Sequence, residues 1–270
     1  MMKKGLLVLA AVLISFITHA QDYSLFQKFR FIQSGDTLPY RLLLPENYNP
    51  KKKYPLVLFL HGRGESGNDN EAQLLHGAAL FLKAENRKNF PAIVVFPQNA
   101  VKYYWSNVQT IADADGKRSF YFTEDGPPSP SMQLVMGLMD NLGRQYRIKE
   151  DQVYVMGLSM GGMGTFEIVN RMPHAFAAAV PICGGANPAI AAHLKNTAWW
   201  VFHGDKDVVV APEYSRKMEE AMKAKGVDVR ATYYPEAGHN SWDSAFAEPG
   251  LLPWLFAHKR KDNFGKPSNN

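Results

Sequence analysis

Short runs of hydrophobic residues recur along most of this chain and are separated by amphipathic segments. The run over 54–60 reads YPLVLFL, and the run over 92–96 reads AIVVF. Continuous apolar runs of this length predict strands that are buried on both faces, as in a parallel sheet. The same kind of pattern predicts further strands over 152–156, 176–182, 199–202 and 229–234.

Helical periodicity occupies the segments between these runs. It predicts helices over 71–83, 131–145, 160–171 and 212–225. Near the N-terminus, two shorter segments over 29–33 and 38–44 flank the turn at Ser34-Gly35-Asp36 and predict a hairpin. Strands that alternate with helices imply parallel crossovers with helices on both faces of the sheet. We therefore expect a three-layer α/β sandwich whose mostly parallel sheet of about eight strands carries the hairpin at its edge.

Composition places the chain among ordinary globular proteins. Of its 270 residues, 46% are hydrophobic and 20% are charged, which excludes a disordered chain, a collagen and a coiled coil. Its single cysteine, Cys183, cannot form an internal disulfide and excludes a cysteine-rich metal site. The sequence also lacks the H-E-x-x-H spacing of helical zinc sites. We expect neither a metal nor another cofactor.

The first twenty residues have the tripartite pattern of a secretory signal peptide. Lys3 and Lys4 precede an uncharged apolar run over 5–17, and small residues around Ala20 offer a cleavage site before Gln21. The apolar run is short for a permanent bilayer span, although an uncleaved anchor is the alternative interpretation. We expect a protein that is exported to the periplasm or the medium, without a stable membrane anchor.

Basic residues give the full chain a formal net charge of +5. Part of this charge lies in the predicted signal peptide, and much of the rest lies in two short clusters at 51–53 and 258–261. Such clusters are typical of solvated loops and tails, and no aromatic residues accompany them in the pattern of a nucleic-acid groove. We expect no nucleic-acid partner.

A G-x-S-x-G motif, Gly157 to Gly161, follows the predicted strand QVYVM and opens a predicted helix. A serine at such a sharp turn projects its hydroxyl from strained backbone, and flanking glycines remove clashes that a Cβ would cause. The N-terminus of the helix also favours negative charge nearby. These features predict that Ser159 is a nucleophile.

A serine nucleophile needs a base, and the base needs a carboxylate that orients it. The strand over 199–202 ends in HGDKD, and the strand over 229–234 ends in PEAGH. These loops supply Asp207 and His239, in the chain order serine, acid, histidine that this kind of site uses.

Two other aspartates compete for the role of the acid. Asp205 directly follows its strand, where it can cap the turn, whereas Asp207 lies further into the loop and reaches the histidine loop more easily. Asp243 lies on the helix that we expect after the histidine. We therefore favour Asp207.

Acyl transfer also requires donors for a developing oxyanion. One predicted donor is the backbone N–H of Met160, directly after the nucleophile. The other comes from the glycine-rich loop HGRGESG that follows the run over 54–60. There we favour the N–H of Arg63, with Gly62 as the alternative. Glu65 of the same loop either ties the loop down or touches the substrate.

Taken together, these segments resemble the α/β-hydrolase superfamily, in its secreted phospholipase/carboxylesterase-like branch. The resemblance covers roughly residues 37 to 257 and rests on the motifs YPLVLFLHGRGESGNDN, GLSMGGMGTFE, PICGGA, WVFHGDKDVVV and GHNSW. This branch is similar to prolyl-oligopeptidase catalytic domains, to predicted bacterial peptidases and to feruloyl- and acetyl-xylan-type esterases. The large propeller domain of the prolyl peptidases would not fit in this chain.

The resemblance implies a triad of Ser159, Asp207 and His239, with an oxyanion hole at Arg63 and Met160. These groups can meet only if one sheet carries them all, so we expect one catalytic domain over 21–270. The implied activity is that of a serine esterase that cleaves carboxylic esters through an acyl-enzyme.

The substrate is predicted less sharply than the chemistry. Aromatic residues in the long segment 98–130, such as Trp105, and Trp242 after the predicted base could contact a sugar or a phenolic acyl group, or could serve packing. Small-molecule or polysaccharide-linked esters are the expected substrates. The alternatives are a serine peptidase that acts on short peptides and a catalytically silent hydrolase fold that binds glycans.

Overall fold

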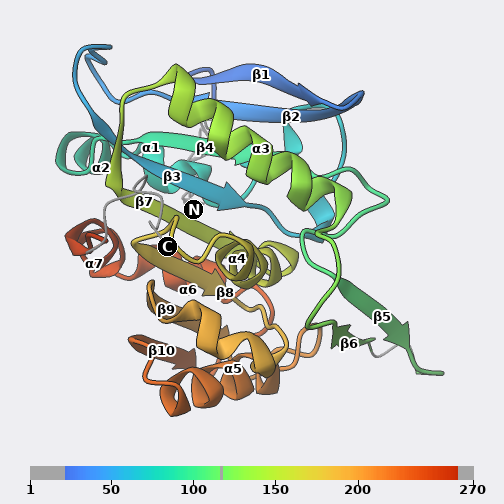
Figure 1. The fold of residues 1–270 in the computed structure, drawn as a ribbon. Helices are drawn as coiled ribbons and strands as arrows, with labels where there is room; N and C mark the ends of the chain where they lie inside the picture. The colour runs from blue at the N-terminus through green and yellow to red at the C-terminus, as the bar shows by residue number, and fades with distance from the viewer. Residues whose placement is uncertain (1–21, 116–117, 261–270) are drawn as a thin grey trace, which may run out of the picture.

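The computed structural model describes residues 22–115 and 118–260 (Figure 1). The predicted signal peptide lies outside these described residues. No helix within the described ranges has both the length and the apolar character needed to cross a membrane.

An eight-stranded sheet forms the centre of the structure, in the order β1-β2-β4-β3-β7-β8-β9-β10. The six strands from β4 to β10 in this order are parallel, whereas β2 pairs antiparallel with both β1 and β4. The predicted hairpin at the sheet edge is therefore confirmed. The strands are β1 Phe26–Gln33, β2 Asp36–Leu43, β3 Tyr54–Leu60, β4 Ile93–Pro97, β7 Ile148–Leu158, β8 Ala178–Ile182, β9 Ala198–Gly204 and β10 Val229–Tyr234.

Helices cover both faces of this sheet, as the alternating pattern predicts (Figure 1). Leu56 and Leu58 of β3 belong to the apolar cluster under α3, α4 and α5, whereas Val57 and Phe59 belong to the cluster under α1, α6 and α7. Alternate residues of this one strand thus contribute to the apolar cores on the two faces of the sheet. The helices are α1 Ala78–Leu82, α2 Ala84–Asn89, α3 Pro130–Gln145, α4 Met160–Arg171, α5 Glu213–Ala224, α6 Trp242–Ala247 and α7 Leu251–Ala257, with short 3₁₀ helices η1 Arg63–Glu65, η2 Ala72–Leu74 and η3 Pro188–Leu194.

The helix predicted over 71–83 is interrupted at Gly77. This residue has a φ of 83°, which leaves η2 and the short α1 on either side of it. A Cβ at Gly77 would lie 2.4 Å from Cζ of Phe59. The close approach to the Phe59 ring, together with the left-handed backbone, therefore accounts for the break.

The long segment over 98–130 contains a separate two-stranded antiparallel ribbon. Its strands are β5 Val108–Ala112 and β6 Arg118–Phe122, and the ribbon projects near the end of the sheet at which β3 and β7 finish (Figure 1). Phe120 anchors the ribbon by packing with Met163 and Val210, and its N–H donates to the Tyr214 hydroxyl at 2.9 Å. The segment therefore borders the carboxyl ends of the parallel strands.

Replacing Gly77 with alanine should destabilise the fold. The new methyl group would clash with Phe59, whose ring is fully buried, and the backbone there disfavours any residue with a Cβ. We expect the free energy of unfolding to fall by about 2–4 kcal/mol, measured by denaturant titration. Gly143→Ala is the matched control, because a Cβ on this residue of α3 would meet nothing within 4 Å. That variant should gain up to about 1 kcal/mol; an equal effect of the two changes would contradict the interpretation.

Candidate active site

Ser159 occupies a strained turn between β7 and α4. Its φ of 53° and ψ of −119° lie in a backbone region that non-glycine residues rarely adopt. A Cβ at Gly157 would lie 2.2 Å from the carbonyl oxygen of Gly161, and a Cβ at Gly161 would lie 1.9 Å from that of Leu60. Close backbone contacts therefore require glycine at both positions. This is the physical reason expected for the glycines of the motif.

Three side chains from different loops form a hydrogen-bonded chain at this turn. Ser159 Oγ lies 2.9 Å from His239 Nε2, and His239 Nδ1 lies 2.7 Å from Asp207 Oδ2. Because a carboxylate only accepts, the proton of the neutral imidazole belongs on Nδ1, which leaves Nε2 free to accept from the serine hydroxyl. The structure thus brings together the three residues that the sequence singles out for the triad.

The Asp207 carboxyl is held as an anion by its hydrogen bonds. Burial by itself raises its pKa, but hydrogen bonds from His203, His239 and the N–H of Val210 outweigh burial and leave the pKa well below its ordinary value. Its Oδ1 accepts the N–H groups of Val209 and Val210, each at 2.9 Å. A fixed negative charge therefore faces the ring of His239.

The competing aspartates have other partners. Asp205 forms an ion pair with Arg216. Asp243 accepts a hydrogen bond from the Asn240 side chain at 3.3 Å. Of the three candidates, Asp207 is the one whose carboxyl reaches His239.

A second histidine, His203, contacts the same carboxyl oxygen. Its Nε2 lies 3.2 Å from Asp207 Oδ2 and 2.8 Å from the carbonyl oxygen of Val210, while its Nδ1 lies 2.7 Å from Ser215 Oγ. This contact with Asp207 was not predicted from the sequence. The spacing in H-G-D-K-D was a usable signal, since it places the two residues four positions apart across a tight turn.

The predicted oxyanion donors lie on the same cavity as the nucleophile. Arg63 and Met160 line a cavity of about 250 Å³ together with Ser159 and His239. Each is the first residue of its helix, where backbone N–H groups lack intrahelical acceptors. The Arg63 side chain is held aside, because its Nη1 donates to the carbonyl oxygen of Tyr103 at 2.9 Å.

His61 fixes the loop that carries Arg63. Its Nε2 accepts the N–H of Asn99 at 2.9 Å, and its Nδ1 lies 2.6 Å from the carbonyl oxygen of Gly62. Burial lowers the pKa of His61 to about 4, so the ring is neutral at pH 7 and Nδ1 can donate to Gly62. His61 therefore holds the backbone of this loop in place.

The two predicted substrate-contacting tryptophans lie in different surroundings. Trp242 lines the cavity, with its ring centroid 5.4 Å from that of His239. Trp105 is 0% exposed, and its Nε1 donates to the carbonyl oxygen of His61 at 3.0 Å. The prediction of a substrate contact for Trp105 is therefore wrong: the ring packs behind the loop in the core. Phe120, another aromatic residue of the segment 98–130, lines the cavity instead, as does Arg118, which was not predicted.

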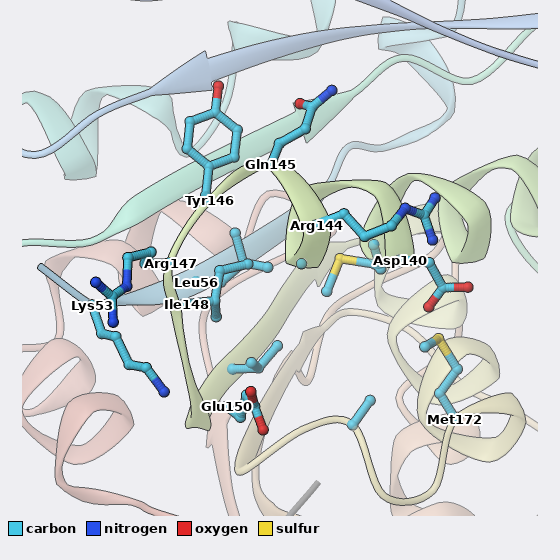
Figure 2. Close-up of a pocket in the computed structure, with 14 residues that line it drawn as sticks. Lys53, Leu56, Asp140, Arg144, Gln145, Tyr146, Arg147, Ile148, Glu150 and Met172 are labelled. Atoms are coloured by element: carbon cyan, nitrogen blue, oxygen red, sulfur yellow. The ribbon is translucent and has the colours of Figure 1, made fainter. Parts of the chain in front are cut away.

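A larger cavity of about 490 Å³ lies at the opposite end of the parallel strands. Figure 2 shows Lys53 and Arg147 on one side of it, and Asp140 and Met172 on the other. Residues that line it directly precede β3 and open β7, whereas the nucleophile follows β7. Since its lining contains no serine and no histidine, this cavity is not the candidate active site.

Cys183, Asp207 and His239 lie close enough to be tested as a metal site, with their ligand atoms within 4.8 Å of one another. Burial, and after it the charge of Asp207, raise the pKa of the Cys183 thiol far above its ordinary value. A metal needs the thiolate, which this site disfavours. The hydrogen bond between Asp207 and His239 also uses two of the three ligands, so the group fits the hydrogen-bonded chain better than a metal.

The sheet order, the strained serine turn and the hydrogen-bonded chain define an α/β-hydrolase. The model of the Esterase family matches residues 34–230, so the chain belongs to this family. A curated relative, the bifunctional acetylxylan esterase/xylanase of Neocallimastix patriciarum, is 27% identical over 143 residues, which are 53% of this chain and 17% of the relative.

Solved structures have the same fold. A thermostable esterase superposes with a TM-score of 0.79 at 34% identity, covering 88% of this chain and 64% of that one. The feruloyl esterase module from Clostridium thermocellum complexed with sinapinate has a TM-score of 0.65 at 17% identity, covering 89% and 91%. An acylaminoacyl peptidase from Pyrococcus horikoshii has a TM-score of 0.61 at 14% identity, covering 90% and 43%. The last two similarities concern the fold alone.

The buried neutral ring of His61 predicts a pH-dependent stability. Its pKa of about 4 in the fold lies below the ordinary value of 6.5, so the unfolded chain binds the extra proton first as the pH falls. The contribution of this ring is complete above pH 6.5 and is lost progressively down to about pH 4. We expect this group to account for a loss of about 3 kcal/mol in the free energy of unfolding over that interval.

Denaturant titrations at several pH values test this expectation. His61→Gln should remove most of this slope, because an amide does not titrate, whereas the exposed His193→Gln should keep it. Equal slopes in the wild type and in His61→Gln would show that another group is responsible.

Proposed function

We propose that this protein is a secreted serine esterase that cleaves carboxylic esters through an acyl-enzyme. The observation that carries the proposal is the hydrogen-bonded chain from Ser159 through His239 to Asp207 at the wall of a cavity. Membership of the Esterase family supports the reaction class. The N-terminal pattern of residues 1–20 supports export, and one sheet that carries all the loops of the site supports a single catalytic domain over 21–270.

The proposed reaction has two matched halves. His239 Nε2 takes the proton of Ser159 as Oγ attacks the ester carbonyl carbon, and the N–H groups of Arg63 and Met160 hold the resulting oxyanion. The Asp207 carboxylate stabilises the protonated ring, which then gives its proton to the leaving alcohol oxygen. Water, activated in the same way by His239, attacks the acyl-enzyme and releases the acid.

We further propose polysaccharide-linked acyl groups as the substrate class. The acetylxylan esterase activity in the name of the curated relative supports this choice. The candidate cavity is also suited to a partly apolar, partly polar ligand, since it combines Phe120 and Trp242 with Arg118 and Glu65.

Ser159→Ala should abolish the activity without unfolding the protein. We expect the rate of 4-nitrophenyl acetate hydrolysis to fall by about 10³-fold or more, because the nucleophile is lost. Fluorophosphonate labelling should vanish in the same variant, while its melting temperature should match that of the wild type. Ser244→Ala, on the nearby α6, is the control and should retain both labelling and turnover. Full activity of Ser159→Ala would reject the proposed nucleophile.

Two neighbouring aspartates allow a matched test of the proposed acid. Asp207→Asn removes the anion that faces His239, so we expect kcat to fall by about 10³–10⁴-fold. Asp205→Asn breaks only the ion pair with Arg216 and should stay within about twofold of the wild type. Steady-state kinetics on one ester compare the two variants. A larger loss in Asp205→Asn than in Asp207→Asn would overturn the assignment.

A further inference from the structure

Glu65 places a buried carboxyl group at the candidate active site. The residue is 7% exposed, ends the short helix η1 and lines the same cavity as Ser159 and His239. Polar atoms so far from water normally have hydrogen-bond partners inside the protein, because an unmade bond leaves the full cost of desolvation. The surroundings of its two oxygens therefore indicate what the group does.

One of these oxygens has no partner. Glu65 Oε1 lies 3.8 Å from Nε2 of His76, whereas Oε2 is buried and has no hydrogen-bond partner among the described residues. A methyl group built on Gly62 would come within 3.0 Å of Glu65 Oε2 and 3.6 Å of Ser159 Cβ. The unpaired acceptor and the proposed nucleophile therefore border the same small space. A donor group on a bound substrate would satisfy this acceptor.

Ring contacts place Glu65 on the side of the site where the base lies. The His76 ring beside Glu65 lies 5.1 Å from the ring of Trp242, and Trp242 in turn lies 5.4 Å from the ring of His239. In the proposed mechanism His239 hands its proton to the leaving oxygen. The alcohol half of the ester must therefore occupy this side of the cavity.

The charges around the cavity favour a neutral donor over a cationic one. Arg118 also lines this cavity, so its positive charge would repel an ammonium group there. A hydroxyl group carries a donor without this repulsion.

We propose that Glu65 accepts a hydrogen bond from a free hydroxyl on the alcohol half of the substrate, and so selects esters of polyols such as sugars. The inference rests on the proposed function and deepens it by naming a residue that determines specificity. It assigns Glu65 a contact with substrate, whereas the loop itself is already held by His61 and Asn99.

The test compares two acetate esters that differ in one group. In 2-hydroxyethyl acetate a hydroxyl takes the place of the terminal methyl of propyl acetate. Acetate release gives kcat/KM for each ester, and the ratio is divided by the ratio for hydroxide-catalysed hydrolysis of the same pair. We expect the wild type to favour the hydroxyl ester by about tenfold or more, and Glu65→Leu to bring the ratio to about one.

Two further variants are compared by the same ratio of the two esters. Glu65→Gln should keep part of the preference, because its amide oxygen still accepts. Glu85→Gln, at an exposed position on α2, should keep the full ratio of the wild type. If Glu65→Leu does not fold, as judged by circular dichroism, the ratio of Glu65→Gln decides: no change from the wild-type ratio overturns the inference.

The outcomes separate this inference from the proposed function. If the corrected ratio of the wild type is about one, or if Glu65→Leu slows both esters alike and leaves that ratio unchanged, Glu65 only supports the loop and the inference is refuted. If the wild type hydrolyses no ester and Ser159 resists fluorophosphonate, the proposed function itself is refuted, and the role of Glu65 is refuted with it.

Discussion

Gly161 in α4 lies so close to the end of β3 that a Cβ on it would come within 1.9 Å of the carbonyl oxygen of Leu60. This close contact is possible because β3 and β7 are adjacent and parallel, so that the turn after one lies beside the loop after the other. The contact sets Ser159 next to Gly62 and Arg63, which places the proposed nucleophile and oxyanion donors together. Even one methyl group at Gly161 would force them apart.

Buried polar groups hold the loops around this contact. The neutral ring of His61 ties Gly62 to Asn99, and the indole of Trp105 caps the carbonyl oxygen of His61 from behind. Because each of these bonds is buried, losing any one would leave a polar atom without a partner in a region that water does not reach. Buried aromatic and histidine side chains thus hold the loop that positions Arg63.

The sequence alone predicted the structure where a local pattern of residues determines it. The apolar runs predicted the parallel strands, and the glycines around Ser159 predicted a turn that only close packing explains. Prediction from the sequence failed where the local structure depends on a residue far away in the chain. The break at Gly77 depends on the ring of Phe59, which lies 18 positions away in the sequence. Nothing in the segment around Trp105 tells whether its ring faces the cavity or the core.

Two histidines contact the same carboxyl oxygen, and their different burial gives them different roles. Both His203 and His239 lie within hydrogen-bonding distance of Asp207 Oδ2. The side chain of His203 is 0% exposed, and its ring nitrogens are also engaged by Ser215 and Val210, so it can only orient the carboxyl group. The side chain of His239 is 21% exposed, with Nε2 directed at Ser159. The same carboxylate therefore anchors one ring inside the protein and leaves the other at the cavity, where a proton can be exchanged with a substrate.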